Sequence, residues 1–293
     1  MMQLKEFAEQ ILAIVRDKAD GDFNVWITSI SKNNGTVFTG ITTSGDGKQP
    51  TIYLDGYYNR FVHNQVNAEE VADIVYEIIM EQMNYVPDIK LTDLMDWEQM
   101  KLKICAKLIN AEKNKELLWD APHRFFLDFA IVYYIRISED ENILQSIDVR
   151  NKYLKLWGVS ENDLCRVGLK NLEATTNVLF KNMCDILPLW MQKPEEPRIP
   201  MYVLSNSSRM YGASVLLIEN VLKEISQSLG DLIILPSSLH DLIVLPQDQH
   251  EKVLKMFLEM VKYVNENDVP PEDYLSDHVY VYDSEKLELR IAA

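Results

Sequence analysis

Two short aliphatic runs, each closed by Leu-Pro, place the strongest constraint on how this chain can fold. The runs Leu232–Pro236 and Leu242–Pro246 flank a polar stretch, Ser237–Asp241. A run of four aliphatic residues that stops at a proline favours a buried strand over a helix, because proline has no amide hydrogen for the next rung of a ladder. The segment therefore predicts two strands of one sheet, joined by a polar turn.

Helix and strand patterns alternate irregularly along the rest of the chain. The patterns predict helices over 4–15, 67–79, 160–183, 213–229 and 248–264, and strands over 23–30, 37–42, 51–54, 125–137, 143–149, 201–204, 278–282 and 287–291. The segment 97–109 begins as a helix and becomes a strand near Ile104. Hairpins interleaved with helices predict an α+β fold with largely antiparallel sheets.

A dense group of prolines predicts a boundary between two lobes. Four prolines fall within residues 188–200, too close together for a helix or a central strand. We therefore expect an N-terminal α+β lobe over residues 1–187, a proline-rich linker over 188–200 and a C-terminal α+β module over 201–293.

The charge balance restricts the class of partner. The chain carries 45 acidic and 29 basic residues, a formal net charge of -16. Such a surface repels phosphate backbones and anionic lipid, so direct binding to nucleic acid or to a membrane is disfavoured. The N-terminus lacks the pattern of a signal peptide, and no apolar run approaches the roughly 20 residues that span a bilayer. We expect a cytoplasmic protein with a protein partner; an acidic decoy of a nucleic-acid-binding partner is an alternative that requires clustered charge.

No familiar catalytic or cofactor motif is present in the sequence. It contains no Gly-rich phosphate loop, no His-Glu-x-x-His and no Gly-x-Ser-x-Gly. The three cysteines, Cys105, Cys165 and Cys184, lie far apart and none belongs to a Cys-x-x-Cys pair, so the sequence supports neither a disulfide framework nor a zinc site. We therefore expect a protein that acts by binding, with no cofactor and no bound metal.

Two polar clusters near the C-terminus are the candidates for catalysis. His240 and Asp241 follow Ser237 in the turn between the Leu-Pro strands, and Asp277 and His278 open the last hairpin. A carboxylate can fix the tautomer of a histidine, so such residues can supply a general base or a metal ligand. Serine, aspartate and histidine also gather at turns, because their side chains bond nearby backbone amides. We favour this structural role; the alternative is a hydrolase or metal-dependent enzyme in which these side chains converge in a cleft.

Four residues in the middle of the chain are candidates for ligand binding. Asn110 and Asn114 flank a charged stretch, where an amide side chain can bind a ligand or cap a helix. His123 precedes Asp128, which lies within the apolar run 125–137. A carboxylate buried in such a run is costly unless it meets a donor, so we expect Asp128 to accept hydrogen bonds.

Several of these stretches resemble an uncharacterised protein family. The similarity rests, in chain order, on Leu108–Leu118, Pro122–His123 with Asp128, Gly212–Ser214, Leu235–Asp241 and Tyr274–Asp283. Over almost its whole length the chain resembles the family catalogued as domain of unknown function 5688. The resemblance implies a bacterial source, largely Firmicutes, and a cytoplasmic protein. It implies no catalytic residue, because no activity is attached to that family.

Overall fold

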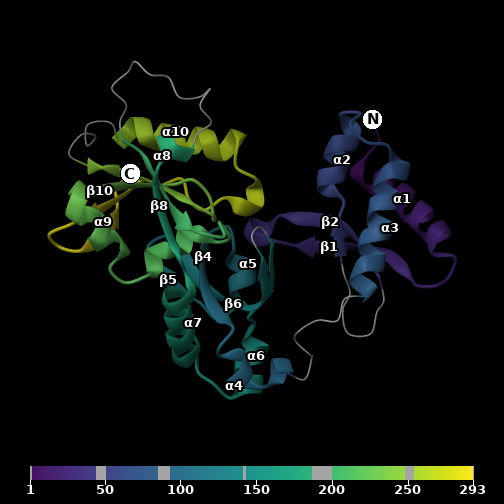
Figure 1. Ribbon diagram of the computed structural model, residues 1–293, viewed down its shortest axis with the longest axis horizontal. Helices are drawn as coiled ribbons and strands as arrows, with labels where there is room; N and C mark the ends of the chain where they lie inside the picture. The colour runs from purple at the N-terminus through teal and green to yellow at the C-terminus, as the bar shows by residue number, and fades with distance from the viewer. Residues whose placement is uncertain are drawn as a thin grey trace. The chain divides into compact units, whose positions relative to one another are not determined.

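The computed structural model divides the chain into two compact units, Met1–Leu91 and Thr92–Ala293 (Figure 1). It describes residues 2–43, 51–84, 93–140, 143–186, 200–247 and 254–292. Within these ranges the first unit holds a three-stranded sheet, and the second unit holds a four-stranded and a six-stranded sheet. Strand pairing is antiparallel, and helices accompany each sheet. The predicted α+β class is confirmed.

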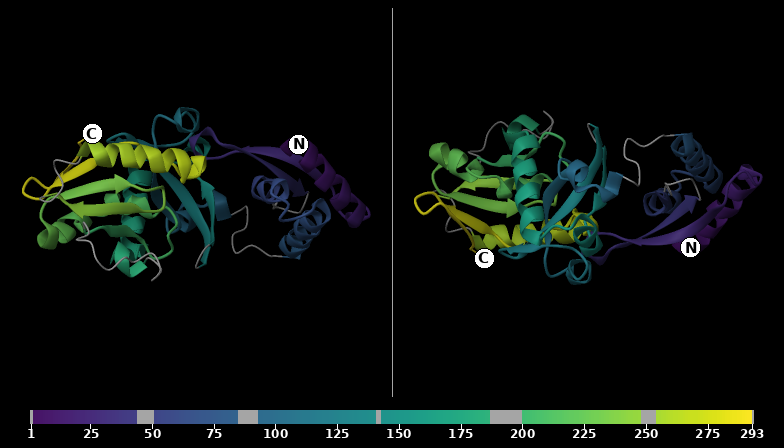
Figure 2. Two further views of the ribbon diagram at one scale, coloured as in Figure 1. Left: turned by 90° about the horizontal axis from the view of Figure 1, so that it is seen from above. Right: turned by 90° about the horizontal axis from the view of Figure 1, so that it is seen from below.

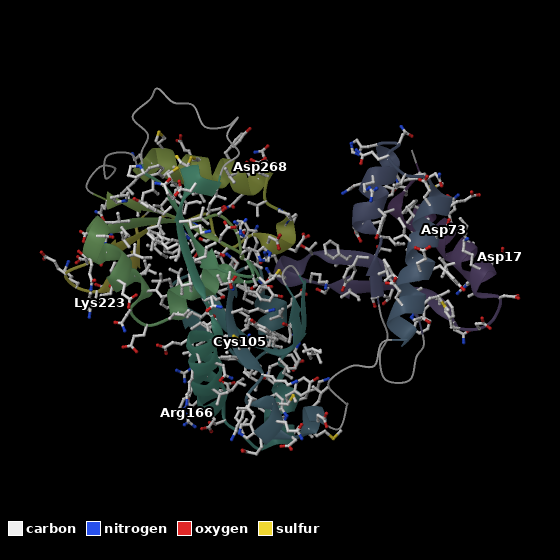
Figure 3. All side chains as sticks on the ribbon, viewed as in Figure 1. Asp17, Asp73, Cys105, Arg166, Lys223 and Asp268 are labelled. Carbon is white, nitrogen blue, oxygen red and sulfur yellow. The ribbon has the colours of Figure 1, made fainter. Side chains whose placement is uncertain are left out.

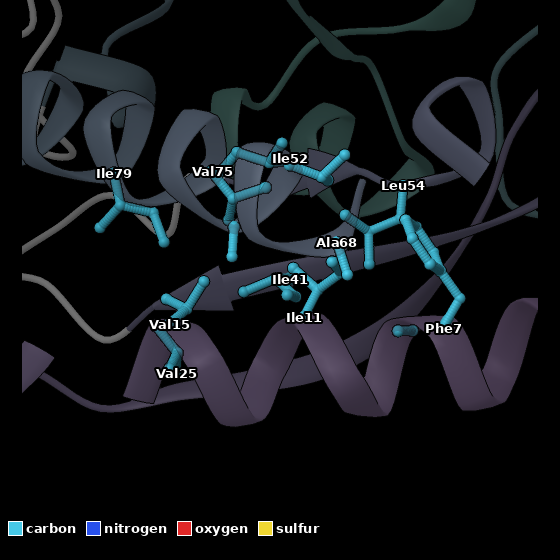
Figure 4. Packing of buried hydrophobic residues seen from close by; sticks show 13 residues of the cluster. Phe7, Ile11, Val15, Val25, Ile41, Ile52, Leu54, Ala68, Val75 and Ile79 are labelled. Carbon is cyan, nitrogen blue, oxygen red and sulfur yellow. The ribbon is translucent and has the colours of Figure 1, made fainter. Parts of the chain in front are cut away.

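The first unit packs its sheet against three helices. The chain forms α1 (Leu4–Ala19), β1 (Val25–Ser31), β2 (Val37–Thr43), β3 (Thr51–Tyr53), α2 (Asp55–Val62) and α3 (Ala68–Asn84). Helices α1 and α3 each bury one apolar stripe, and Figure 4 shows these side chains meeting those of the sheet in one cluster: Phe7, Ile11, Val15, Ile41, Ile52, Leu54, Val75 and Ile79. Removing this surface from water stabilises the unit by about 25 cal/mol per Å².

Local signals account for the turns of the first unit. Asn34 and Gly35, between β1 and β2, have φ angles of 59° and 69°, a conformation that these two residue types tolerate. Asn67 and Glu70 form a capping box at the start of α3. The Glu70 amide donates to Asn67 Oδ1 at 3.0 Å, and the Asn67 amide donates to Glu70 Oε2 at 2.9 Å.

The second unit begins with the four-stranded sheet. Its elements are α4 (Trp97–Met100), β4 (Ile104–Asn110), α5 (Lys115–Leu118), β5 (Arg124–Phe126), β6 (Phe129–Asp140), β7 (Ile143–Asp148), α6 (Asn151–Trp157) and α7 (Glu161–Thr175). Strand β6 pairs with β4, β5 and β7. Helix α7 approaches the sheet closely at Gly168, where an added Cβ would stand 2.7 Å from the Tyr133 ring.

The six-stranded sheet completes the second unit. Its strands are β8 (Val178–Asn182), β9 (Tyr202–Asn206), β10 (Leu232–Pro236), β11 (Leu242–Pro246), β12 (Tyr280–Asp283) and β13 (Glu288–Ile291), in the order β13-β12-β10-β11-β9-β8. The two Leu-Pro strands are neighbours, as predicted. Helix α10 (Leu254–Asn267) lies along one face of this sheet (Figure 2), where Phe257 and Val261 pack against Ile233 and Leu245.

The apolar run 125–137 is not the single strand that the sequence predicts. The chain reverses at Leu127 and Asp128, so that β5 and β6 form a hairpin in which Phe126 pairs with Phe129. The reversal has no Gly, Asn or Pro to announce it, and Leu127 takes the positive φ of 56° that the turn requires. Asp128 therefore lies in a turn and not within a strand.

Two predicted helices also differ from the structure. The helix predicted over 160–183 begins at the expected capping box of Ser160 but ends at Thr175, and is followed by β8 and the short α8 (Met183–Ile186). The helix predicted over 213–229 is divided into a 3₁₀ helix, η4 (Gly212–Leu217), and α9 (Val221–Leu229). Asn220 separates them with a φ of 69°, which no continuous helix allows.

The predicted linker over 188–200 lies outside the described residues except for Pro200. The strands on either side of it, β8 and β9, pair with each other in the six-stranded sheet. The two lobes at this boundary stay a prediction, whereas the compact units divide between residues 91 and 92.

Most charged side chains lie outside the cores; Lys107 on β4, 8% exposed and paired with Asp148, is an exception. Figure 3 shows Arg166, Lys223 and Asp268 at the periphery of the ribbon, whereas Cys105 on β4 lies inside it and is 2% exposed. None of the helices in the described ranges combines the length and the apolar character needed to cross a membrane.

Candidate functional site

The turn between β5 and β6 presents the Asp128 carboxylate to the loop that precedes β12. The other residue of this turn, Leu127, has a φ of 56°. This conformation costs a non-glycine residue roughly 1–2 kcal/mol, because the Cβ approaches the following carbonyl oxygen. Such strain persists where the surroundings compensate for it. The hydrogen bonds of Asp128 supply that compensation.

Three side chains from residues 276–280 converge on the Asp128 carboxylate. Ser276 Oγ donates to Oδ2 at 2.7 Å, and Tyr280 OH donates to Oδ1 at 2.5 Å. His278 Nδ1 lies 3.0 Å from Oδ2. These contacts join residues 148 to 152 positions apart in the sequence. The prediction that Asp128 meets hydrogen-bond donors is confirmed.

Two of these donors are buried and act as fixed supports. Burial, and then the neighbouring Asp128 carboxylate, raise the pKa of Tyr280 above its ordinary range, so its phenol keeps its proton. Ser276 is 1% exposed, and its Oγ also accepts from the His278 amide at 3.0 Å. Because the Ser276 proton is directed to Asp128 and its oxygen is buried, Ser276 holds the loop in place and is not positioned as a nucleophile.

His278 is the exposed member of this cluster, with 47% of its side chain accessible to water. Its Nδ1 faces the carboxylate of Asp128, which can only accept, so Nδ1 carries the proton. In the neutral ring Nε2 therefore carries the lone pair. A carboxylate that orients an imidazole in this way leaves the opposite nitrogen available to take a proton from a bound molecule.

A pocket of about 470 Å³ opens beside His278. Its wall contains charged and titratable side chains from the β4–α5 loop, the β5–β6 turn, α10 and the loop before β12: Glu112, Lys113, Asp128, Lys262, Asp277 and His278. Leu258 and Tyr274 add apolar surface. The volume lies within the roughly 300–1,000 Å³ that small-molecule sites occupy.

Contacts within the protein hold the wall of this pocket. Asn265 on α10 donates from Nδ2 to Asp277 Oδ1 at 2.8 Å and to the Ser276 carbonyl at 2.9 Å. The Lys113 ammonium lies 3.4 Å from the centre of the Tyr274 ring, a cation–π contact. Burial, and then the charge of Asp277, raise the pKa of Tyr274 above its ordinary range, so this phenol also stays neutral.

Asn110 and Asn114 lie close to the pocket, but they use their amides inside the protein. Asn110 lines the pocket and is 6% exposed. Its Nδ2 donates to the Leu275 carbonyl at 2.9 Å, and its Oδ1 accepts from the Lys113 amide at 2.8 Å. Asn114 Nδ2 donates to the Asn110 carbonyl at 2.8 Å. Asn110 thus ties the end of β4 to the loop before β12, and Asn114 holds the β4–α5 loop against Asn110.

His240 belongs to a different hydrogen-bond network and does not line the pocket. Its Nε2 lies 3.1 Å from Asp273 Oδ1, and its Nδ1 faces the Tyr211 amide at 3.2 Å. The Tyr211 ring stacks on His240, and the Lys107 ammonium lies 4.3 Å from the centre of the Tyr211 ring. The hydrogen bond and charge of Asp273 raise the pKa of His240, whereas burial acts in the opposite direction.

The remaining candidates also lie outside the pocket wall. Ser237 and Asp241 close the turn between β10 and β11, where the Ser237 amide donates to the Asp241 carbonyl at 3.3 Å. His123 Nδ1 lies 2.9 Å from the Ala121 carbonyl. The structure therefore places Asp277, His278, Asp128 and Asn110 around one pocket, and it separates Ser237, His240, Asp241 and His123 from it.

Six residues of the pocket are not among the candidates predicted from the sequence: Glu112, Lys113, Leu258, Lys262, Tyr274 and Ser276. Ser276 lies next to Asp277 and His278, which are candidates, so the sequence indicates the region but not this residue. Lys113 lies between Asn110 and Asn114. Tyr274 and Lys262 carry no local signal, because a tyrosine before a hairpin and a lysine on a helix are common in proteins of every function.

The described part of the chain contains no group of three or more His, Cys, Asp or Glu residues arranged to hold a metal ion. The fold and the pocket together define an α+β protein with a pocket of charged and apolar side chains, where two antiparallel sheets of one unit approach each other. The chain belongs to the Family of unknown function (DUF5688), whose model matches residues 4–284. This confirms the resemblance seen in the sequence. No curated protein and no solved structure matches the chain.

Proposed function

We propose that this protein binds a small polar molecule in the pocket beside His278. The observation that supports the proposal is the prior organisation of the pocket wall. Asp128 holds His278 and Ser276, while Asn265 holds Asp277, through hydrogen bonds between groups of the protein itself. A site whose polar groups are already ordered loses less entropy when a ligand binds, which favours affinity.

The test is a screen of polar metabolites in which the amide NMR signals of the protein report binding. We expect a bound compound to give saturable shifts for residues 276–278 and for Lys262, which line the pocket. Leu258→Trp places an indole in the pocket wall and should abolish these shifts. Leu156→Trp, at a leucine of α6 that is 49% exposed and lies outside the wall, is the matched control. Binding that survives Leu258→Trp unchanged would place the ligand elsewhere.

Acid–base catalysis is a second candidate function, favoured by one specific contact. Asp128 Oδ2 lies 3.0 Å from His278 Nδ1, and this fixes the imidazole with Nε2 free of the carboxylate. Conversion of a bound compound would be followed by NMR. His278→Gln should then abolish conversion while the compound still binds, and equal loss of both would indicate a role in binding alone. This candidate uses His278 and Asp128, not the wider cluster with Ser237, His240 and Asp241.

Several expectations from the sequence remain predictions. These are a protein partner, the absence of direct contact with nucleic acid or membrane, and a cytoplasmic location. The alternative of an acidic decoy rests on the net charge of -16 alone.

A further inference from the structure

We infer that the ligand of this pocket carries an oxyanion, a carboxylate or a phosphate group, which binds to Lys113 and Lys262. This inference rests on the proposed function and names the ligand class for the same site. The charges on the pocket wall support it, once those that are already paired within the protein are set aside.

Each carboxylate of the wall has at least one partner within the protein. Asp128 accepts from Ser276, His278 and Tyr280. Asp277 accepts from Asn265 at 2.8 Å. Glu112 pairs with the Lys115 ammonium. A ligand cation that approaches one of these carboxylates competes with its present partner, and that competition reduces the gain from the new contact.

The two ammonium groups of the wall have no such partner. Across the ranges that the structure describes, neither Lys113 nor Lys262 pairs with a carboxylate. Lys262 lies on the exposed side of α10. Lys113 contacts the Tyr274 ring, and a cation–π contact leaves its positive charge in place. The ammonium groups of Lys113 and Lys262 are therefore available to a ligand without the loss of an ion pair.

The net charge of -16 does not prevent an anion from binding here. Exposed charges farther away than the Debye length, about 8 Å at physiological ionic strength, are largely screened. Groups in contact with the ligand thus outweigh distant carboxylates. Hydrogen bonds from ammonium groups to oxyanions are also stronger than bonds between neutral groups.

His278 adds a third nitrogen to the same wall. Because Asp128 occupies Nδ1, the ring can turn only its Nε2 edge toward a ligand. A protonated ring donates from Nε2, so an oxyanion bound to the lysines gains a further donor. A neutral ring presents a lone pair there and offers no such bond.

The experiment titrates the whole chain with inorganic phosphate and, separately, with citrate, and follows amide NMR signals of residues 276–278. Glycerol and choline serve as neutral and cationic probes at matched ionic strength. We expect at least one oxyanion to give saturable shifts. Lys262→Gln and Lys113→Gln should each raise its Kd by about tenfold or more, the loss expected for one charged hydrogen bond. Lys255→Gln removes the same charge from α10 outside the wall and should change the Kd less than about twofold.

The outcomes separate this inference from the proposed function. Shifts with glycerol, choline or a screened metabolite that lacks an anionic group, without shifts for phosphate or citrate, would overturn the oxyanion class and leave the pocket as a binding site. Oxyanion shifts that are equal in Lys262→Gln, Lys113→Gln and Lys255→Gln would overturn the roles of the two lysines. If the amide signals of residues 276–278 did not shift with any probe or any screened metabolite, both the oxyanion inference and the proposed function would be contradicted.

Discussion

Asp128 is the residue on which the arrangement of the site depends. Its carboxylate accepts from Ser276, His278 and Tyr280, and so joins the β5–β6 turn to the start of β12. Asp128→Asn retains the shape but replaces an acceptor with an amide nitrogen that faces donors. We expect the free energy of unfolding of the second unit to fall by about 2–4 kcal/mol, measured by denaturant titration. Asp268→Asn, at an exposed residue after α10, should stay within about 0.5 kcal/mol of the unmodified protein.

His240 provides a prediction about pH. Asp273 raises the pKa of His240 above its ordinary value of 6.5, so protonation of the folded state is favoured. The resulting stability is fully present below the unfolded pKa, and it is lost as the pH rises through the higher folded pKa. Asp273→Asn removes this contribution. The gap in unfolding free energy between the unmodified protein and Asp273→Asn should therefore be larger at about pH 5.5 than at about pH 8.5.

The opposite pH dependence would have a specific cause in the same network. The Tyr211 amide lies 3.2 Å from His240 Nδ1 and requires that nitrogen to accept. If the difference in unfolding free energy between the unmodified protein and Asp273→Asn grew with pH, the Tyr211 amide would be shown to keep the His240 ring neutral despite the charge of Asp273.

At the scale of elements, the β5–β6 hairpin contains a residue type that does not suit its turn. Leu127 has a φ of 56°, which asparagine tolerates better than leucine. Leu127→Asn should raise the melting temperature, by an amount equivalent to about 0.5–1 kcal/mol, and Leu127→Val should lower it, because a β-branched residue is strained there. Leu102→Asn, at a leucine that is 72% exposed and has no positive φ, should have little effect. A lower melting temperature for Leu127→Asn would mean that the packing of this leucine matters more than its backbone strain.

The elements that could be predicted from the sequence are those with local causes. The Leu-Pro strands, the Asn67 and Ser160 capping boxes and the Asn34–Gly35 turn each depend on residues within a few positions of one another. The reversal at Leu127 is not predicted, because Asp128 is its single turn-favouring residue and lies within a long apolar run. Its support comes from donors about 150 residues later in the chain. For the same reason the sequence could indicate that Asp128 needs a partner, but not that the partner is His278.

At the scale of the whole molecule, the described residues form two units with separate cores. The core of the first unit joins α1, α3 and the three-stranded sheet, and the second unit contains a cluster between α10 and the six-stranded sheet together with the buried strands of the four-stranded sheet. We therefore expect residues 92–293 to fold without the first unit. A fragment of this range should unfold cooperatively and keep the amide signals of residues 276–278, measured by calorimetry and NMR. A fragment without a cooperative transition would show that the second unit depends on the first.

The separation between Asp128 and its donors also determines when the site forms during biosynthesis. Ser276 is added to the chain 148 residues after Asp128. At about 5–20 residues per second, a ribosome takes roughly 7–30 s to cover that interval. Until then, water takes the place of these donors at the Asp128 carboxylate of the nascent chain. The pocket can therefore close only after Ser276 has been translated, and a chain arrested before Ser276 would have the turn without the donors that hold it.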